Sequence, residues 1–363
     1  MKSITMKISL LSEFDTYCPG DVVKGSVNLS ISHEVIISRV SVKLIGVAVI
    51  NYKGKDPPDQ ELALLKKETY VEDEKYLYSS QDGNLQDLFT EAGNHELPFT
   101  FVLPDSIPSS FESKECYIRY TISSSLEGAK LPLLSEKVII SVNAPLDLNN
   151  IPKSQYPSTA IIDQKNNTWC WCAKTTLHAG VHTSRRGYVP GEIIILNAEI
   201  NNLDSKPVVS VRAQLIQIIK YYHKAWPRKT KRMASEITRG YILPNESQYW
   251  MGETLIVPAL VSSYMKYCNL IDIKYKIYFR IAKAGVPEII MKLPIIIGNV
   301  PLMGCVDVLS DAIDAEERSI ATLERATKNH EPCHFGPHDV TESNSENVQD
   351  QCLFSPRYIT YSS

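Results

Sequence analysis

Cysteine and histidine side chains gather in one short stretch of the chain, and their chemistry suits zinc. Cys170 and Cys172 precede His178 and His182, and zinc accepts thiolate and imidazole ligands. The spacing differs from the common Cys-x-x-Cys pair, and an extended strand would point Cys170 and Cys172 to one face but leave the placement of the histidines to chance. We therefore favour thiols packed beside the neighbouring tryptophans, and we expect neither a metal nor a cofactor.

A basic run interleaved with aromatic residues suits binding to an anionic surface. Residues 220–232 contain six lysines and arginines, namely Lys220, Lys224, Arg228, Lys229, Lys231 and Arg232. Near acidic lipid headgroups each such residue contributes about 1 kcal/mol of attraction. No nucleic-acid-binding motif accompanies the run, so we expect no nucleic-acid partner. The alternative interpretation is a solvated hairpin tip that binds nothing.

The net charge of −3 conceals an asymmetry along the chain. Residues 1–150 carry 14 basic and 21 acidic side chains, a net of −7. Residues 151–303 carry 20 and 9, a net of +11, and residues 304–363 carry 4 and 11, a net of −7. A basic middle between acidic flanks favours an anionic partner: acidic lipid, a phosphorylated segment or the protein's own tail.

The sequence contains no motif for enzymatic chemistry. It has no Gly-x-Ser-x-Gly elbow, no glycine-rich phosphate loop and no His-Glu-x-x-His helix, so we expect no catalytic residues and no enzyme. The first residues lack the apolar core of a signal peptide, and no apolar run reaches the roughly 20 residues that span a bilayer. These features predict a cytoplasmic protein with reduced thiols.

The elements that position these side chains follow from a turn that occurs twice. Tyr17-Cys-Pro19-Gly20-Asp21 is echoed by Tyr188-Val-Pro190-Gly191-Glu192, at an offset of 171 residues. Proline fixes φ at the first central position of a type II turn, and glycine tolerates positive φ at the second. β-Branched residues follow both turns and start strands. The repeat predicts two copies of one domain, with both glycines at positive φ.

Short alternating strands and turn signals predict an all-β fold of two tandem immunoglobulin-like β-sandwiches. We place the first domain at residues 1–146, a linker rich in proline and asparagine at 147–166, and the second domain at 167–303. Residues 304–363 form an acidic tail that we expect to be mostly disordered. Within it, 306–326 permits a short amphipathic helix, and disorder is expected from Thr327 onward.

Several segments resemble one protein family. The run from Gly93 to Phe111, which leads into Tyr117-Ile-Arg-Tyr, resembles the N-domain signature of the α-arrestins, the arrestin domain-containing proteins. Residues 186–192 resemble the opening of their C-domain and 293–302 its close. The resemblance covers about residues 5–303 and implies the arrestin fold.

The same resemblance implies a function. It suggests a cytosolic adaptor that binds cytoplasmic segments of membrane receptors or transporters, at the plasma membrane or endosomes. Such an adaptor directs endocytosis, protein transport and ubiquitination of its cargo. A retromer-type scaffold subunit of a trafficking coat, related in fold, is the alternative.

The tail bears on the ubiquitin-ligase part of that function. In many α-arrestins it carries Pro-Pro-x-Tyr, which WW domains of ubiquitin ligases bind as a polyproline II segment. This chain lacks the motif, and its nearest match is the block Phe354-Ser355-Pro356-Arg357-Tyr358. Serine stands there in place of the first proline, which removes a groove contact and some preorganisation. We expect weak binding to WW domains.

Overall fold

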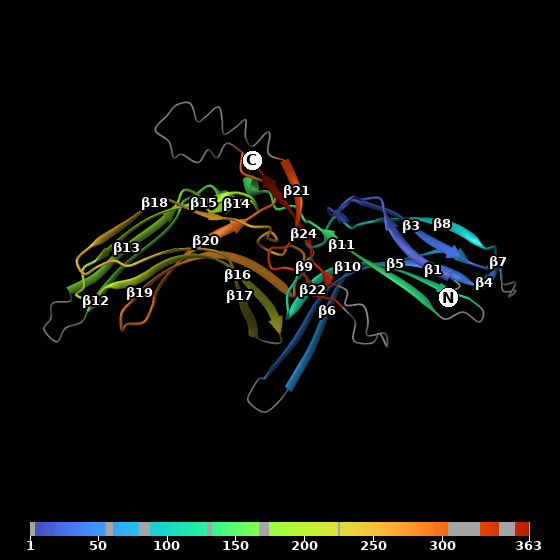
Figure 1. Cartoon of the computed structure of the whole chain (residues 1–363), viewed down its shortest axis with the longest axis horizontal. Coiled ribbons are helices and arrows are strands. Elements are labelled where there is room, and N and C mark those ends of the chain that lie inside the picture. Colours follow the sequence, from blue (N-terminus) through green and yellow to red (C-terminus); the bar gives the residue numbers. More distant parts are fainter. Residues whose placement is uncertain are drawn as a thin grey trace.

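The computed structural model describes residues 4–55, 61–79, 88–128, 133–166, 174–223, 226–303, 327–340 and 353–362. Figure 1 shows two β-sandwiches side by side, with the last strands of the chain lying at their junction. The prediction of an all-β protein made of two tandem sandwiches is confirmed. Within the described ranges, no helix is long and apolar enough to cross a bilayer.

The first sandwich consists of two sheets. One has the strand order β1 (Ile4–Leu10), β3 (Val22–Ile31) and β8 (Gly93–Val102). The other has the order β2 (Thr16–Tyr17), β11 (Leu134–Val142), β10 (Cys116–Glu127), β5 (Arg39–Lys55) and β6 (Glu61–Ser79), with β9 (Phe111–Glu112) beside β10. A short pair, β4 (Val35–Ile37) and β7 (Leu88–Thr90), closes one end.

The second sandwich repeats this plan. One sheet has the order β12 (Ser158–Asn166), β13 (Lys174–Thr183), β15 (Ile193–Asn202) and β18 (Ser247–Ile256). The other has the order β14 (Gly187–Tyr188), β20 (Ile289–Ile297), β19 (Ile271–Lys283), β16 (Val208–His223) and β17 (Trp226–Arg239). β2 and β14 each pair parallel with the last strand of their own sandwich, so the repeat extends to topology.

The two Pro-Gly turns occupy equivalent positions between β2 and β3 and between β14 and β15. The N–H of Asp21 donates to the carbonyl of Cys18, and Glu192 donates in the same way to Val189, both at 3.1 Å. Gly20 has φ of 86° and Gly191 of 96°. Such values suit the second central position of a type II turn, where a side chain would be strained.

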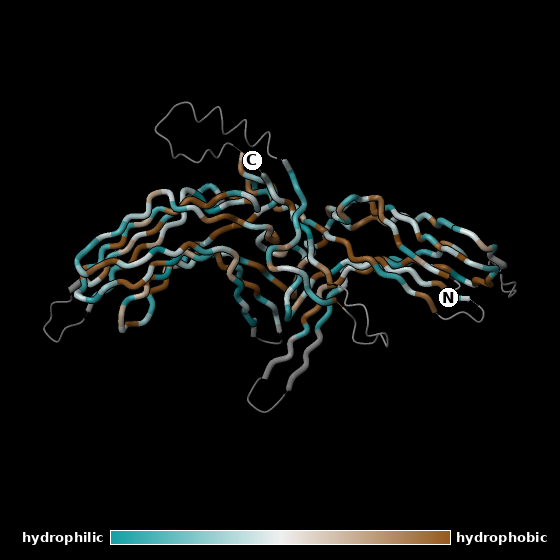
Figure 2. The backbone as a smooth tube through the Cα atoms, viewed as in Figure 1, coloured by the Kyte–Doolittle hydropathy of each residue, from teal (hydrophilic) through white to brown (hydrophobic). Residues whose placement is uncertain are grey.

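The core of each sandwich lies between its two sheets and is built by alternation along the strands. In β10 every second residue is buried, and Ile118, Tyr120 and Ile122 are fully covered. Figure 2 shows the same arrangement as apolar backbone segments inside each sandwich. Because successive strand residues point to opposite sides of a sheet, this alternation also fixes which polar residues face outward.

The structure corrects two boundaries that we inferred from the sequence. The predicted linker 147–166 is partly a strand, because its turn residues end at Pro157 and the β-prone residues after it form β12, the edge strand beside β13. Before it lie two 3-10 turns, η1 (Leu148–Asn150) and η2 (Pro152–Ser154). Leu148 packs in a small cluster with Val189, Ile296 and Leu302 from the second sandwich.

The described part of the tail is the second correction. Disorder was expected from Thr327 onward, but β21 (Thr327–Pro332) pairs antiparallel with β24 (Arg357–Ser362), and β22 (His338–Asp339) pairs with β23 (Leu353–Phe354). Composition predicted disorder because the segment is acidic and poor in apolar residues, whereas Tyr358 and Ile359 are buried where the two sandwiches meet and Phe335 and Tyr361 are partly buried. The predicted helix at 306–326 lies outside the described residues.

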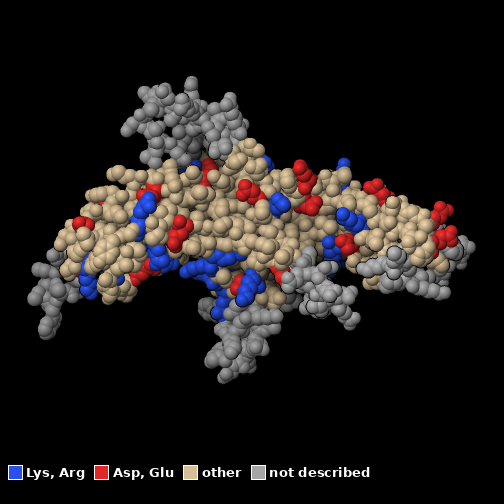
Figure 3. Space-filling view, viewed as in Figure 1, with Lys and Arg blue, Asp and Glu red and all other residues tan. Residues whose placement is uncertain are grey.

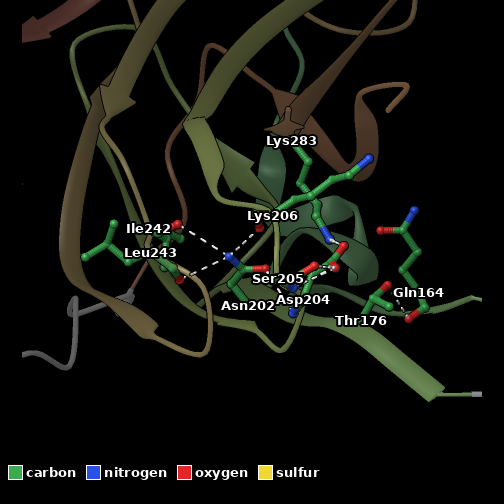
Figure 4. A network of polar contacts seen from close by, with 9 residues as sticks. All are labelled: Gln164, Thr176, Asn202, Asp204, Ser205, Lys206, Ile242, Leu243 and Lys283. Carbon is green, nitrogen blue, oxygen red and sulfur yellow. Dashed lines mark hydrogen bonds and ion pairs between the residues drawn. The ribbon is translucent and has the colours of Figure 1, made fainter. Parts of the chain in front are cut away.

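A polar network closes one end of the second sandwich, as Figure 4 shows. The Asn202 side-chain amide donates to the carbonyl of Lys206 at 3.0 Å and to that of Leu243 at 3.1 Å. Nearby, Lys283 Nζ lies 2.7 Å from Asp204 Oδ2, and the lysine side chain is only 1% exposed. The hydrogen bond from Lys283 lowers the pKa of Asp204 below its usual value.

We expect Asp204→Asn to destabilise the protein at about pH 7 by about 1–3 kcal/mol, because it leaves a buried ammonium group without its anion. Because the pKa of Asp204 is lower in the folded than in the unfolded state, its ionised carboxylate stabilises the fold above the unfolded pKa. This stabilisation is lost as the pH falls through the folded pKa. The deficit of the variant should therefore shrink below about pH 4. Urea unfolding of both proteins at several pH values measures the difference in the free energy of unfolding. Asp163→Asn, whose carboxylate is 53% exposed beside His178, is the matched control, and an equal loss in both variants would contradict the prediction.

Candidate functional site

The basic run 220–232 is divided by the geometry of the β16–β17 hairpin. Across this hairpin Lys220 pairs with Lys229, and Ile218 pairs with Lys231. Because side chains alternate, Lys229 and Lys231 lie on one side of the sheet and Arg232 on the other. Lys224 lies outside the described residues. The six basic residues predicted as one site therefore do not form one surface.

The outward side gains lysines from two further strands. In β19, Lys274 lies opposite Ile218 and Lys276 opposite Ile216, and Lys292 of β20 lies opposite Tyr278. We call this surface the lysine face, which consists of Lys220, Lys229, Lys231, Lys274, Lys276 and Lys292. Figure 3 shows Lys and Arg side chains gathered below the middle of the molecule, over β16 and β17. The register of the sheet thus joins residues that lie far apart in the sequence.

Apolar side chains and one aromatic ring support the lysine face. Ile216, Ile218 and Tyr278 form a small buried cluster on this side of the sheet. The Tyr278 ring lies 5.2 Å from Lys231 Nζ and 5.6 Å from Lys292 Nζ. A ring at this distance attracts a cation through its quadrupole and holds both lysines over the sheet. The lysine stems cover the apolar cluster while the ammonium groups reach solvent.

Acidic residues pair with basic side chains at both ends of this surface, but they are fewer than the basic residues. Arg212 and Arg280 each lie 2.6 Å from a carboxylate oxygen of Glu288. Burial raises the pKa of Glu288, but the hydrogen bonds from these two arginines outweigh it and lower the pKa overall. At the other end, Asp272 lies 3.3 Å from Lys274. The lysine face therefore keeps a net positive charge that can attract an anionic partner.

On the opposite side of β17, Arg232 joins the two sandwiches. Its Nε donates to the Gln217 side chain at 3.0 Å, and its Nη1 donates to the carbonyl of Glu112 in the first sandwich at 3.3 Å. The guanidinium also lies 4.1 Å from the Phe335 ring, which belongs to the tail. Arg232 is thus a structural residue of the domain junction, which corrects its assignment to an anion-binding surface.

We call this junction the seam, and define it by Ser110, Glu112, Ser141, Asn143, Pro190, Arg232 and Asn299. It holds a buried ion pair, in which Arg119 Nε lies 2.8 Å from a Glu112 carboxylate oxygen and the Glu112 side chain is 2% exposed. Burial raises the pKa of Glu112 even though Arg119 opposes the shift. Asn299 links the sandwiches a second time, because its side chain donates to the carbonyl of Ala144 at 2.9 Å.

The remaining predicted residues lie elsewhere. Cys170 and Cys172 are outside the described residues, and His178 forms a 2.7 Å contact with Asp163. In the tail block, Pro356 and Tyr358 are buried at the seam, and Phe354 is half-buried.

Sequence reasoning missed the seam because its contacts join residues up to 248 positions apart. It also missed Lys274 and Lys276, although their alternation with tyrosine was visible.

Comparison with known proteins gives two domain matches. The family model described as arrestin (or S-antigen), N-terminal domain, matches residues 6–149, and the one for the C-terminal domain matches residues 173–302. Arrestin domain-containing protein 1 of Mus musculus is 28% identical over 300 residues, which cover 80% of this chain and 64% of that protein. Arrestin domain-containing protein 4 of Homo sapiens is 27% identical over 297 residues, or 79% of this chain and 69% of that protein. The chain therefore spans less than two thirds of the mouse relative.

Arg232 and its neighbour Lys231 provide a matched test of the division between the two sides of β17. We expect Arg232→Met to lower the free energy of unfolding by about 1–3 kcal/mol, because buried acceptors on both sandwiches lose their donor. Lys231→Met should change it by no more than about 0.5 kcal/mol, as is usual for exposed positions. Urea denaturation of both variants measures the difference. Equal effects would show that Arg232 does not hold the seam.

Proposed function

We propose, since this chain belongs to the arrestin domain-containing (α-arrestin) family, that it is an adaptor for membrane proteins. It would bind cytoplasmic segments of receptors or transporters and direct their endocytosis and transport. The ordered match of both arrestin domains, over residues 6–149 and 173–302, carries this proposal. Among the described residues, β1, β8 and β18 lie at the edges of their sheets, which suits the task because an extended cargo segment can add to an edge strand.

We further propose that the lysine face places the adaptor against the anionic headgroups of the plasma membrane or endosomes. Six lysines on one side of a sheet present a concentrated positive charge toward solvent, supported by the Tyr278 ring. Attraction to an acidic leaflet at about 1 kcal/mol per residue is enough to concentrate the protein near its cargo. Screening acts over roughly 8 Å at physiological ionic strength, so this contact should weaken with salt.

Recruitment of a ubiquitin ligase is the least direct part of the proposal. The tail lacks Pro-Pro-x-Tyr, and Pro356 and Tyr358 are buried at the seam. A WW domain would need both side chains exposed in its aromatic groove. We therefore propose that any ligase reaches the cargo complex through another surface or another protein.

The adaptor function is tested by proximity labelling of the full chain in cells, followed by co-purification. We expect membrane receptors or transporters in substoichiometric amounts, because an adaptor binds its cargo transiently. Recovery of a stable stoichiometric coat complex instead would favour a scaffold subunit. Labelling that enriches no membrane protein over a cytosolic control would contradict the adaptor proposal.

The membrane contact is tested by flotation of the full chain with phosphatidylcholine vesicles that contain about one third phosphatidylserine. We expect binding that falls with salt, and a large loss when Lys229, Lys231, Lys276 and Lys292 are changed to glutamate. Four exposed lysines of the first sandwich, Lys7, Lys24, Lys114 and Lys137, provide a control with the same change in net charge. Equal losses in both variants would show that only the total charge matters and that the lysine face is no specific site.

A further inference from the structure

The last strand of the chain contacts both sandwiches at the seam. In β24 the Tyr358 hydroxyl donates to the carbonyl of Ser110 in the first sandwich at 3.1 Å. Three residues later, the Tyr361 hydroxyl donates to the carbonyl of Asn299 in the second sandwich at 2.8 Å. Each ring therefore anchors the strand to a different domain.

The seam also binds the backbone of this strand. Ser141 Oγ accepts a hydrogen bond from the N–H of Arg357 at 3.0 Å, and the Asn143 side chain donates to the carbonyl of the same residue at 3.1 Å. On the other sandwich, the carbonyl of Pro190 accepts from the N–H of Tyr361 at 3.0 Å. Main-chain bonds of this kind hold an extended peptide whatever its side chains, and buried side chains supply the specificity.

Burial shows how completely the seam encloses the segment. Tyr358 is 2% exposed, Thr360 4% and Ile359 5%, and Pro356 is buried too. The segment pairs with β21 along one edge, and its side chains enter a site that two separate domains build together, in the manner of a bound peptide.

The turn at Gly191 gives an independent sign that the seam fits this segment. A Cβ at Gly191 would collide with the backbone carbonyl of Tyr361. At the equivalent turn in the first sandwich, a Cβ at Gly20 would meet only the end of the Asp105 side chain, at 2.6 Å. Both glycines have positive φ, a backbone conformation that other residues rarely adopt. Only Gly191 is also required for the close approach of the tail.

We propose that the seam is a binding site for an extended peptide of the pattern Pro-x-Tyr-x-x-Tyr, and that residues 353–362 are its resident ligand. While it is bound, the segment withholds Pro356 and Tyr358 from any aromatic groove that would recognise them. The site selects unmodified tyrosine at position 358. A phosphate there would bring about two negative charges into a buried position where the hydroxyl now donates to a carbonyl, and would exclude the peptide.

The test uses full-length protein and a fluorescent peptide of residues 353–362. In the variant Tyr358→Ala/Tyr361→Ala the resident segment loses both anchors, so the free peptide should bind it and should bind wild-type protein about tenfold or more weakly. Adding Gly191→Ala to this variant should reduce binding by about tenfold or more, whereas adding Gly20→Ala should leave it unchanged. The peptide phosphorylated at Tyr358 should bind none of the proteins.

Hydrogen exchange provides the second measurement on the same proteins. The amides of Arg357 and Tyr361 should lose protection in Gly191→Ala alone but keep it in Gly20→Ala, while β10 and β19 stay protected in both. The proposal is wrong if the peptide fails to bind the double variant although β10 and β19 remain protected. It is equally wrong if the two glycine variants act alike, or if wild-type protein binds the peptide as well as the double variant does.

Discussion

The two-residue period of a β-strand is the constraint on which the functional surfaces of this protein depend. Along β17 it sends Lys229 and Lys231 to solvent and turns Arg232 toward the first sandwich. One basic run therefore contributes to two surfaces on which positive charge is stabilised in different ways. On the exposed side, charge acts at long range and is screened by salt. On the buried side, the same type of charge is stable only with hydrogen-bond partners and aromatic neighbours.

The seam is a polar junction between the two domains that is stabilised by hydrogen bonds. Arg232, Gln217 and Tyr275 form a chain of hydrogen bonds that ends on the carbonyl of Val261 at 2.7 Å. The buried Glu112 carboxylate has its own partner in Arg119. Each of these side chains has at least one hydrogen-bond partner, which lowers the cost of burying charge at the junction, although Arg232 Nη2 is buried without a partner. The tail completes it by adding Phe335 over the guanidinium and Tyr358 over Ser110.

This arrangement places the proposed membrane contact and the tail site on the two sides of one hairpin. The lysine face lies on the outer side of β16 and β17, and the seam lies on the inner side. The strands β16 and β17 therefore support both the proposed lipid contact on one side and the tail segment on the other. The proposed membrane contact would therefore leave the tail in place at the seam.

The sequence by itself determined the repeated Pro-Gly turns, the alternation that forms the strands, and the two-domain plan, because these are local properties of spacing and residue type. It also carried the arrestin signatures in residues 93–120, 186–192 and 293–302. Only the tertiary structure decided which lysines share a face, since that depends on the register between β16, β17, β19 and β20. The same holds for the tail: its composition predicted disorder, but the contact of Arg357 with Ser141 spans 216 positions. Contacts at such separation leave no local pattern, because both partners look like ordinary surface residues until the two sandwiches meet.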